Sequence, residues 1–140
     1  MQVYLAGPYQ HKIYIESCAQ DLLTIGVGVT SSWLGEAHAP NTQLAELPDD
    51  MNRRYALADL RDIDRADAFV LFTVAANLPP IARAGRHVEF GYALAKGLPI
   101  YVVGKERENI FHYLSDKVRH FDTFNELVDF FARHPRVMGV

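Results

Sequence analysis

The sequence has a single cysteine, Cys18, and no apolar run approaching the ~18 residues that a membrane helix needs. One cysteine excludes an internal disulfide and is typical of proteins in a reducing compartment, so we expect a cytoplasmic location. Cys18 has no motif around it and is interpreted as a small apolar helix residue. The N-terminus lacks the basic and apolar regions of a signal peptide. We therefore expect no contact with a membrane.

Several motifs of cofactor and metal chemistry are also missing. The chain has no G-x-G-x-x-G dinucleotide fingerprint and no phosphate-binding P-loop. Its six histidines show no metal-ligand spacing, and Cys18 has no cysteine partner. Ser31 and Ser32 lack the context of a nucleophile elbow. We therefore expect neither a bound metal nor a cofactor.

Charge is not concentrated in any part of the chain. Fourteen Lys and Arg stand against 17 Asp and Glu, which gives a net charge of -3. Without a basic face or run, binding to a nucleic-acid polymer is not expected. The content of 49% hydrophobic and 22% charged residues is ordinary for a globular protein. Residues 1–140 are expected to form one domain, because this length is common for a single domain.

Apolar runs bounded by glycine and proline predict strands, and stretches with a helical period predict helices between them. The predicted strands are residues 2–6, 27–33, 67–74, 98–103 and a short one within 118–124. The predicted helices are residues 12–25, 49–65, 85–96 and 123–133, the last with Thr123 and Glu126 as a capping box. The stretches 34–48, 75–84 and 104–114 are predicted as loops, the last with one helical turn.

Alternating strands and helices indicate an α/β fold with a parallel sheet. We predict a flavodoxin-like three-layer sandwich with five strands in the order 2-1-3-4-5. Ligands of such folds bind beyond the carboxyl ends of the strands, where the strand order reverses. The segments after Ala6, Trp33, Val74 and Val103 should therefore surround the site.

Glu89 is a single carboxylate within the apolar stretch "GRHVEFGYALAKGLPIYVV". A buried charge is costly, so its presence there requires an explanation. Near a helix N-terminus at the predicted cleft, Glu89 could be kept ionised for chemistry, and Gly85 and Gly91 would let a ligand approach. The alternative is an ordinary helix-start glutamate that caps the helix or is solvated.

Four aspartates, Asp59, Asp62, Asp64 and Asp67, lie in "ADLRDIDRAD". Helical spacing places Asp59 on the face of Ile63, so its side chain could reach inward. The other three are interpreted as solvated charges or as caps of the following turn. Two carboxylates at one cleft are the groups that glycosyl chemistry uses, one at the anomeric carbon and one for a proton.

Further candidates for substrate binding lie in the predicted loops. Gly7, Pro8 and Tyr9 form a turn at the carboxyl end of the first strand, where a ligand could approach. Arg83 and Arg86 could bind a phosphate or a carboxylate, or they could be solvated loop residues. Trp33 and Phe72, and Tyr9 if it turns inward, could stack on a base or belong to the core.

Three segments together resemble the nucleoside 2-deoxyribosyltransferase family and the related deoxynucleoside 5'-monophosphate N-glycosidases. They are "VYLAGPY", "ADLRDIDRADAFVLF" and "GRHVEFGYALAKGLPIYVV", in the order of the family and from Val3 to Gly104. The resemblance implies double displacement at C1' of a 2'-deoxyribose, without a metal or a cofactor. It implies that Glu89 is the nucleophile, that Asp59 assists the departing base and that Tyr4 holds the glutamate.

The same resemblance leaves the substrate open. Transferases carry an acidic residue before the glutamate and an aromatic, acidic tail, whereas this chain has "IARAGRH" and "RHPRVMGV". The monophosphate hydrolases usually have a serine before the glutamate, and here Arg83 or Arg86 would take its place. The expected activity is transfer of deoxyribose from a deoxynucleoside to another base. The alternatives are a deoxynucleoside 5'-monophosphate hydrolase and a non-catalytic nucleotide-binding module. The resemblance also implies a homo-oligomer.

Overall fold

Five parallel strands form one sheet in the computed structural model of the chain, which describes residues 1–36, 47–73 and 84–134. The strand order is β2-β1-β3-β4-β5, so the predicted flavodoxin-like order is confirmed. The strands are β1 (Gln2–Ala6), β2 (Gly28–Val29), β3 (Ala68–Phe72), β4 (Ile100–Val103) and β5 (Val118–Phe121). Every residue of β3 is buried, as expected for a central parallel strand covered on both faces.

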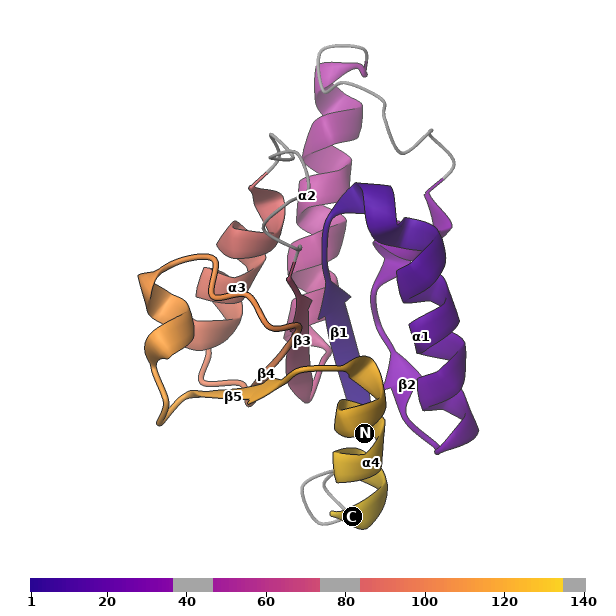
Figure 1. The fold of residues 1–140 in the computed structure, drawn as a ribbon. Coiled ribbons are helices and arrows are strands. Elements are labelled where there is room, and N and C mark those ends of the chain that lie inside the picture. Colours follow the sequence, from indigo (N-terminus) through magenta and orange to yellow (C-terminus); the bar gives the residue numbers. More distant parts are fainter. Residues whose placement is uncertain (37–46, 74–83, 135–140) are drawn as a thin grey trace.

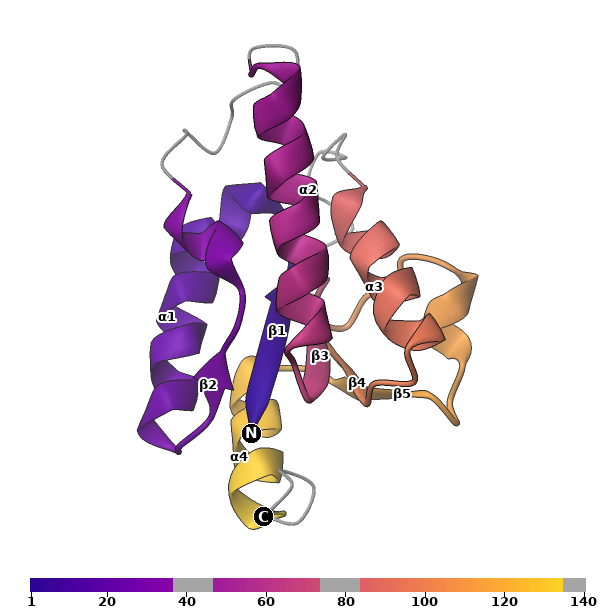
Figure 2. The ribbon, with the colours of Figure 1, turned by 180° about the vertical axis from the view of Figure 1, so that it is seen from behind.

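Helices cover both faces of the sheet, and short 3-10 helices lie in the connections. The α-helices are α1 (Lys12–Thr24), α2 (Asp49–Asp64), α3 (Gly85–Ala95) and α4 (Phe124–Arg133). The 3-10 helices are η1 (Tyr9–His11), η2 (Ser32–Gly35) and η4 (Ile110–Tyr113). Helices α1 and α4 cover one face (Figure 1), and α2 and α3 lie side by side on the other (Figure 2).

Three helix ends have a clear local cause. Gly26 and Gly97 have φ angles of 83° and 75°, a left-handed conformation that ends α1 and α3 at little cost. Thr123 caps α4 by accepting a hydrogen bond from the Glu126 amide at 3.3 Å. The Glu126 carboxylate in turn accepts a hydrogen bond from the amide of Asp122, the residue before the cap. Cys18 is buried in the core, as predicted.

The second strand is much shorter than the predicted range 27–33, because side chains replace the strand ladder. The Ser31 hydroxyl accepts from the Leu5 amide at 2.6 Å and donates to the Leu5 carbonyl at 3.1 Å. The Trp33 indole N–H donates to the same carbonyl at 2.8 Å. These side chains satisfy the hydrogen-bonding groups of the β1 backbone at Leu5, so the chain can leave the sheet after β2 and form η2.

The loops predicted at 34–48 and 75–84 lie largely outside the described residues, whereas the helical turn predicted within 104–114 is η4. No helix in the described ranges has the length and apolar character to cross a membrane.

Candidate active site

The three residues expected to carry the chemistry come from three elements and meet beside β1. Tyr4 lies on β1, Asp59 on α2 and Glu89 on α3. The Tyr4 hydroxyl donates a hydrogen bond to Oε2 of Glu89. The carboxyl groups of Asp59 and Glu89 also share a hydrogen bond, which requires one of them to carry a proton. The structure thus brings together Tyr4, Asp59 and Glu89, which the sequence places up to 85 residues apart.

Tyr4 has almost no freedom to move. Its side chain has no exposed surface, and its ring stacks on Phe69 with a centroid distance of 5.6 Å. Phe69 is the direct partner of Tyr4 in the register of β1 and β3. Packing within the sheet therefore fixes the ring of Tyr4 in the position from which its hydroxyl reaches Glu89.

Glu89 is the fifth residue of α3 and so lies in its second turn, further from the helix start than the sequence suggested. The two glycines on either side lie in open surroundings, because a Cβ added at Gly85 or Gly91 would meet no heavy atom within 4 Å. Both glycines are exposed, and the approach of a ligand at Gly85 or Gly91 stays a prediction.

Burial makes the carboxyl groups of the site unusually weak acids. Burial, and then the charge of Asp59, raises the pKa of Glu89 to about 8, and the Tyr4 hydrogen bond acts in the opposite direction. Burial also raises the pKa of Asp59 to about 6. Glu36, just after η2, has its pKa raised to about 7 by burial and by the charge of Asp59. At neutral pH the Asp59 and Glu89 pair therefore retains one proton.

Tyr9 and Trp33 form a ring pair between η1, which follows β1, and η2, which follows β2. The ring centroids are 5.8 Å apart and the planes are tilted by 45°. Trp33 is buried, whereas Tyr9 is partly exposed and lies close to Lys12, which hydrogen-bonds the Glu36 carbonyl. Trp33 therefore supports the ring of Tyr9, and Tyr9 is the better placed of the two to meet a base. Stacking on a base stays a prediction for both residues.

The Gly7-Pro8 turn is packed tightly against the core. A Cβ at Gly7 would lie 2.5 Å from Cδ1 of Ile15 and 3.3 Å from Cβ of Phe72. Close packing between β1 and α1 is thus sufficient to explain the glycine. Pro8 is buried, and its carbonyl accepts from the His11 amide at the start of the next turn. Binding of a substrate by Gly7 and Pro8 is not tested by these contacts.

Arg86 lies three residues before Glu89 and forms an ion pair that sequence analysis did not find. Its guanidinium binds the carboxylate of Glu108 at 2.8 Å, with exposed side-chain fractions of 9% and 14%. Asn109 lies 3.3 Å from the ring of His87. The start of α3 is thus fastened to the segment after β4. Arg83, the other arginine predicted to bind substrate, lies outside the described residues.

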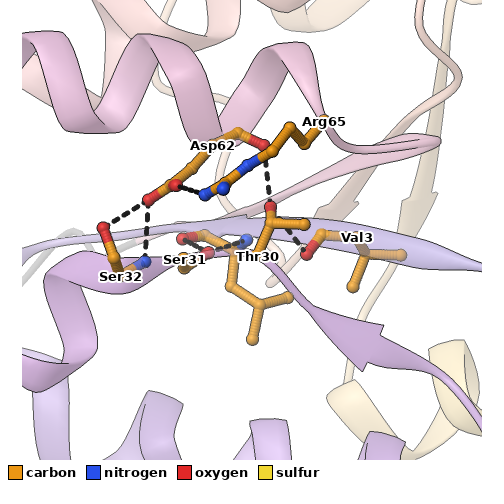
Figure 3. A network of polar contacts seen from close by, with 7 residues as sticks. Val3, Thr30, Ser31, Ser32, Asp62 and Arg65 are labelled. Atoms are coloured by element: carbon orange, nitrogen blue, oxygen red, sulfur yellow. Dashed lines mark hydrogen bonds and ion pairs between the residues drawn. The ribbon is translucent and has the colours of Figure 1, made fainter.

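Asp62 is the clear correction to the sequence analysis, because the prediction that it is solvated is wrong. Its side chain is 2% exposed. The Ser32 amide donates to Oδ2 of Asp62 at 2.8 Å, the Ser32 hydroxyl donates to the same oxygen, and Arg65 pairs with Oδ1 (Figure 3). Asp64, by contrast, is exposed and bonds Tyr92 and Lys96, as the prediction for a surface charge would have it.

No three histidine, cysteine, aspartate or glutamate side chains in the described parts of the chain form a group that could hold a metal ion.

No protein-family model matches the chain, and no curated protein matches its sequence. Among solved structures, the CMP N-glycosidase BcmB of Clostridium botulinum is 22% identical, covers 94% of this chain and 98% of its own, and gives a TM-score of 0.61. A 2-deoxyribosyltransferase of Bacillus psychrosaccharolyticus is 19% identical, covers 91% and 90%, and gives a TM-score of 0.68.

This chain has the fold of these two enzymes. The likeness extends over nine-tenths or more of each chain. At these identities the likeness establishes the fold, and the argument for an activity has to come from the site.

Proposed function

We propose that this chain belongs to the nucleoside 2-deoxyribosyltransferase family and cleaves the N-glycosidic bond of a 2'-deoxynucleoside. The observation that carries the proposal is the partly buried carboxyl pair, in which Glu89 accepts a hydrogen bond from Tyr4 beside Asp59. Two carboxyl groups that share one proton supply both a nucleophile and an acid. The fold shared with a 2-deoxyribosyltransferase and a CMP N-glycosidase supports the same chemistry.

In the proposed reaction, the proton that the pair shares passes from Glu89, the weaker acid, to Asp59, and the ionised Glu89 attacks C1' of the deoxyribose. The bond between C1' and the base nitrogen breaks, and its electron pair stays on the base, which takes the proton from Asp59. The product is an ester between Glu89 and the sugar. A second base then attacks C1', its N–H proton returns to Asp59, and the Glu89 carboxylate leaves. The Tyr4 hydroxyl orients Glu89 for attack, so that the glutamate need not reorganise as the bond forms.

The same first half-reaction followed by water would make the chain a deoxynucleoside 5'-monophosphate hydrolase. This alternative is favoured by the fold likeness to an enzyme named for CMP, and by Arg86 one helical turn before Glu89. To bind a phosphate, Arg86 would have to share its guanidinium with Glu108, its present partner. A third possibility is a nucleotide-binding module without turnover, for which Glu89 would be structural.

The test is to incubate the protein with a deoxynucleoside and a second free base and to separate the products by chromatography. Exchange of the base supports transfer, whereas release of free sugar or sugar phosphate alone supports hydrolysis. If no deoxynucleoside or monophosphate reacts, both enzymatic proposals fail.

Two variants sharpen this test. Glu89→Gln keeps the shape but cannot attack, so we expect loss of several orders of magnitude in rate and loss of the covalent sugar adduct in a mass spectrum of the quenched protein. Glu16→Gln, an exposed position of α1, is the matched control and should behave like wild type. Equal behaviour of wild type and Glu89→Gln would make Glu89 structural.

We also propose that the chain forms a homodimer or a larger oligomer. Apolar side chains lie exposed on α3 and on the neighbouring η4, with exposed fractions of 69% for Val88, 77% for Ile110 and 68% for Tyr113. The two elements touch through the rings of His87 and His112, 5.9 Å apart. A monomer at micromolar concentration in light scattering would contradict this proposal.

A further inference from the structure

Asp62 is the most deeply buried acidic side chain among the described residues, and the proposed reaction does not use it. A buried carboxylate destabilises a protein unless donors surround it. Asp62 has them: the amide and hydroxyl of Ser32 on one oxygen and the guanidinium of Arg65 on the other (Figure 3). Hydrogen bonds to a charged acceptor are the stronger kind. The side chain is thus a firm attachment point.

The attachment joins two elements that contribute to the site. Asp62 belongs to α2, and Ser32 is the first residue of η2. A second contact reinforces it, because the Thr30 hydroxyl donates to the backbone carbonyl of Asp62 at 2.8 Å. Since both the backbone and the side chain of Asp62 are bound, any rotation or sliding of the last turn of α2 relative to the segment after β2 would break these contacts.

Both joined elements carry residues of the proposed site. Asp59 lies three residues before Asp62, so the two share a face of α2 and a rotation of the helix would carry Asp59 away from Glu89. On the other side, η2 carries Trp33, which supports the ring of Tyr9. The carboxylate of Asp62 therefore fixes both Asp59, the aspartate of the carboxyl pair, and the ring pair of Tyr9 and Trp33.

We propose that Asp62 is a positioning residue that holds Asp59 and the Tyr9–Trp33 ring pair in place around the site. The proposal rests on the function proposed for Asp59 and Glu89. Asp62 also acts on Asp59 through its charge, which raises the pKa of that carboxyl. The other ionisable groups that face Asp59 are Glu89 on α3, Tyr4 on β1 and Glu36 after η2, and none of them is altered in the variants below.

Three variants separate the attachment from the charge. Asp62→Asn removes the charge and places an amide N–H, which is a donor, against groups of Ser32 or Arg65 that are themselves donors. Ser32→Ala removes one donor and leaves the charge of Asp62 in place. Asp64→Asn is the matched control, because it is the same change two residues away on α2 at an exposed side chain.

The first readout is the fluorescence of Trp33, the only tryptophan in the chain. We expect acrylamide to quench it severalfold more strongly in Asp62→Asn and in Ser32→Ala than in wild type, because the buried indole becomes accessible. The second readout is the carboxyl-carbon NMR titration of Asp59, identified with Asp59→Asn. The pKa of Asp59 should fall in Asp62→Asn and stay unchanged in Ser32→Ala. Asp64→Asn should match wild type in both.

The third readout is turnover. A small misplacement of reacting groups costs up to about 100-fold in rate, so kcat should fall by about 10- to 100-fold in Asp62→Asn and less in Ser32→Ala, with a smaller change in KM. Quenching and titration that match wild type in Asp62→Asn would overturn the proposal. If Asp62→Asn does not fold, the quenching and kcat of Ser32→Ala decide. If wild type itself has no glycosidic activity, the proposed function fails, and the first two readouts still decide on Asp62.

Discussion

Replacing Tyr4 by phenylalanine removes one oxygen atom and tests the contact on which the proposed function depends. The ring of Tyr4 is fully buried and stacked on Phe69, so phenylalanine should occupy the same space. What is lost is the hydrogen bond donated to Glu89. That bond stabilises the ionised form of Glu89, because it lowers a pKa that burial raises.

The size of the effect follows from the charge on the acceptor. A hydrogen bond to a charged group contributes about 1.5–3 kcal/mol. In Tyr4→Phe, Glu89 holds the shared proton more tightly by that amount, so the fraction of the pair with Glu89 ionised and Asp59 protonated, which is the reactive form, falls with it. Since ~1.4 kcal/mol corresponds to a factor of ten, kcat should fall by about 10- to 150-fold. The upper pKa of the pH–rate profile should rise above its wild-type value.

The assay is base exchange at several pH values, with Tyr101→Phe as the control. Tyr101 is a buried tyrosine of β4 whose ring packs on Phe131, so this variant makes the same chemical change away from the carboxyl pair. Its rate should stay within about twofold of wild type. If Tyr4→Phe kept a wild-type kcat and an unshifted profile, the hydroxyl would have no part in holding Glu89, and the proposed mechanism would lose its support.

Three further predictions concern pH and stability. The wild-type rate should peak between pH 6 and 8, because both carboxyl groups of the pair are protonated below this range and both are ionised above it. The folded state raises the pKa of Glu89 from 4.5 to about 8, so it binds this proton more tightly than the unfolded state and loses stability as pH rises through that range. Glu89→Gln should therefore have a free energy of unfolding a few kcal/mol above wild type at pH 9, with the difference vanishing towards pH 4 in denaturant titrations. Arg86→Met should lose about 3–5 kcal/mol of stability in the same titrations, because it leaves Glu108 buried without its cation, and a second change, Glu108→Leu, should recover most of the loss.

The sequence sufficed for the sheet because its strands are short apolar runs with sharp ends. The run that becomes β3 is buried along its whole length, and Gly26 and Gly97 mark helix ends that the structure shows in a left-handed conformation. The spacing of apolar residues and the glycines or prolines that end a segment are local properties, so they can be recognised without knowledge of the partner segments. The strand predicted at 27–33 was too long because its end depends on contacts with another segment. Its pairing with β1 ends where the side chains of Ser31 and Trp33 hydrogen-bond the backbone of Leu5 in place of a strand. A local sequence pattern does not reveal such contacts.

The candidate site could be predicted in part for a similar reason. Residue type and the resemblance of three segments singled out Tyr4, Asp59 and Glu89, and these side chains do meet. The residues that were missed depend on partners far along the chain. Glu108 is 22 residues from Arg86, and Ser32 is 30 residues from Asp62. No periodicity connects such pairs, because only the order of the strands brings them together.

Asp59 and Asp62 show what separates a reactive carboxyl from a structural one in this fold. They lie one turn apart on α2, and both are withdrawn from water. Asp62 is surrounded by donors from Ser32 and Arg65. Oδ1 of Asp59 is buried without a hydrogen-bond partner among the described residues, and burial raises the pKa of its carboxyl. A carboxylate that is bound by donors at both oxygens and 2% exposed can hold a structure together but is closed to a substrate. An acid that must give a proton to a departing base needs the opposite arrangement, and on this helix only Asp59 has it beside Glu89.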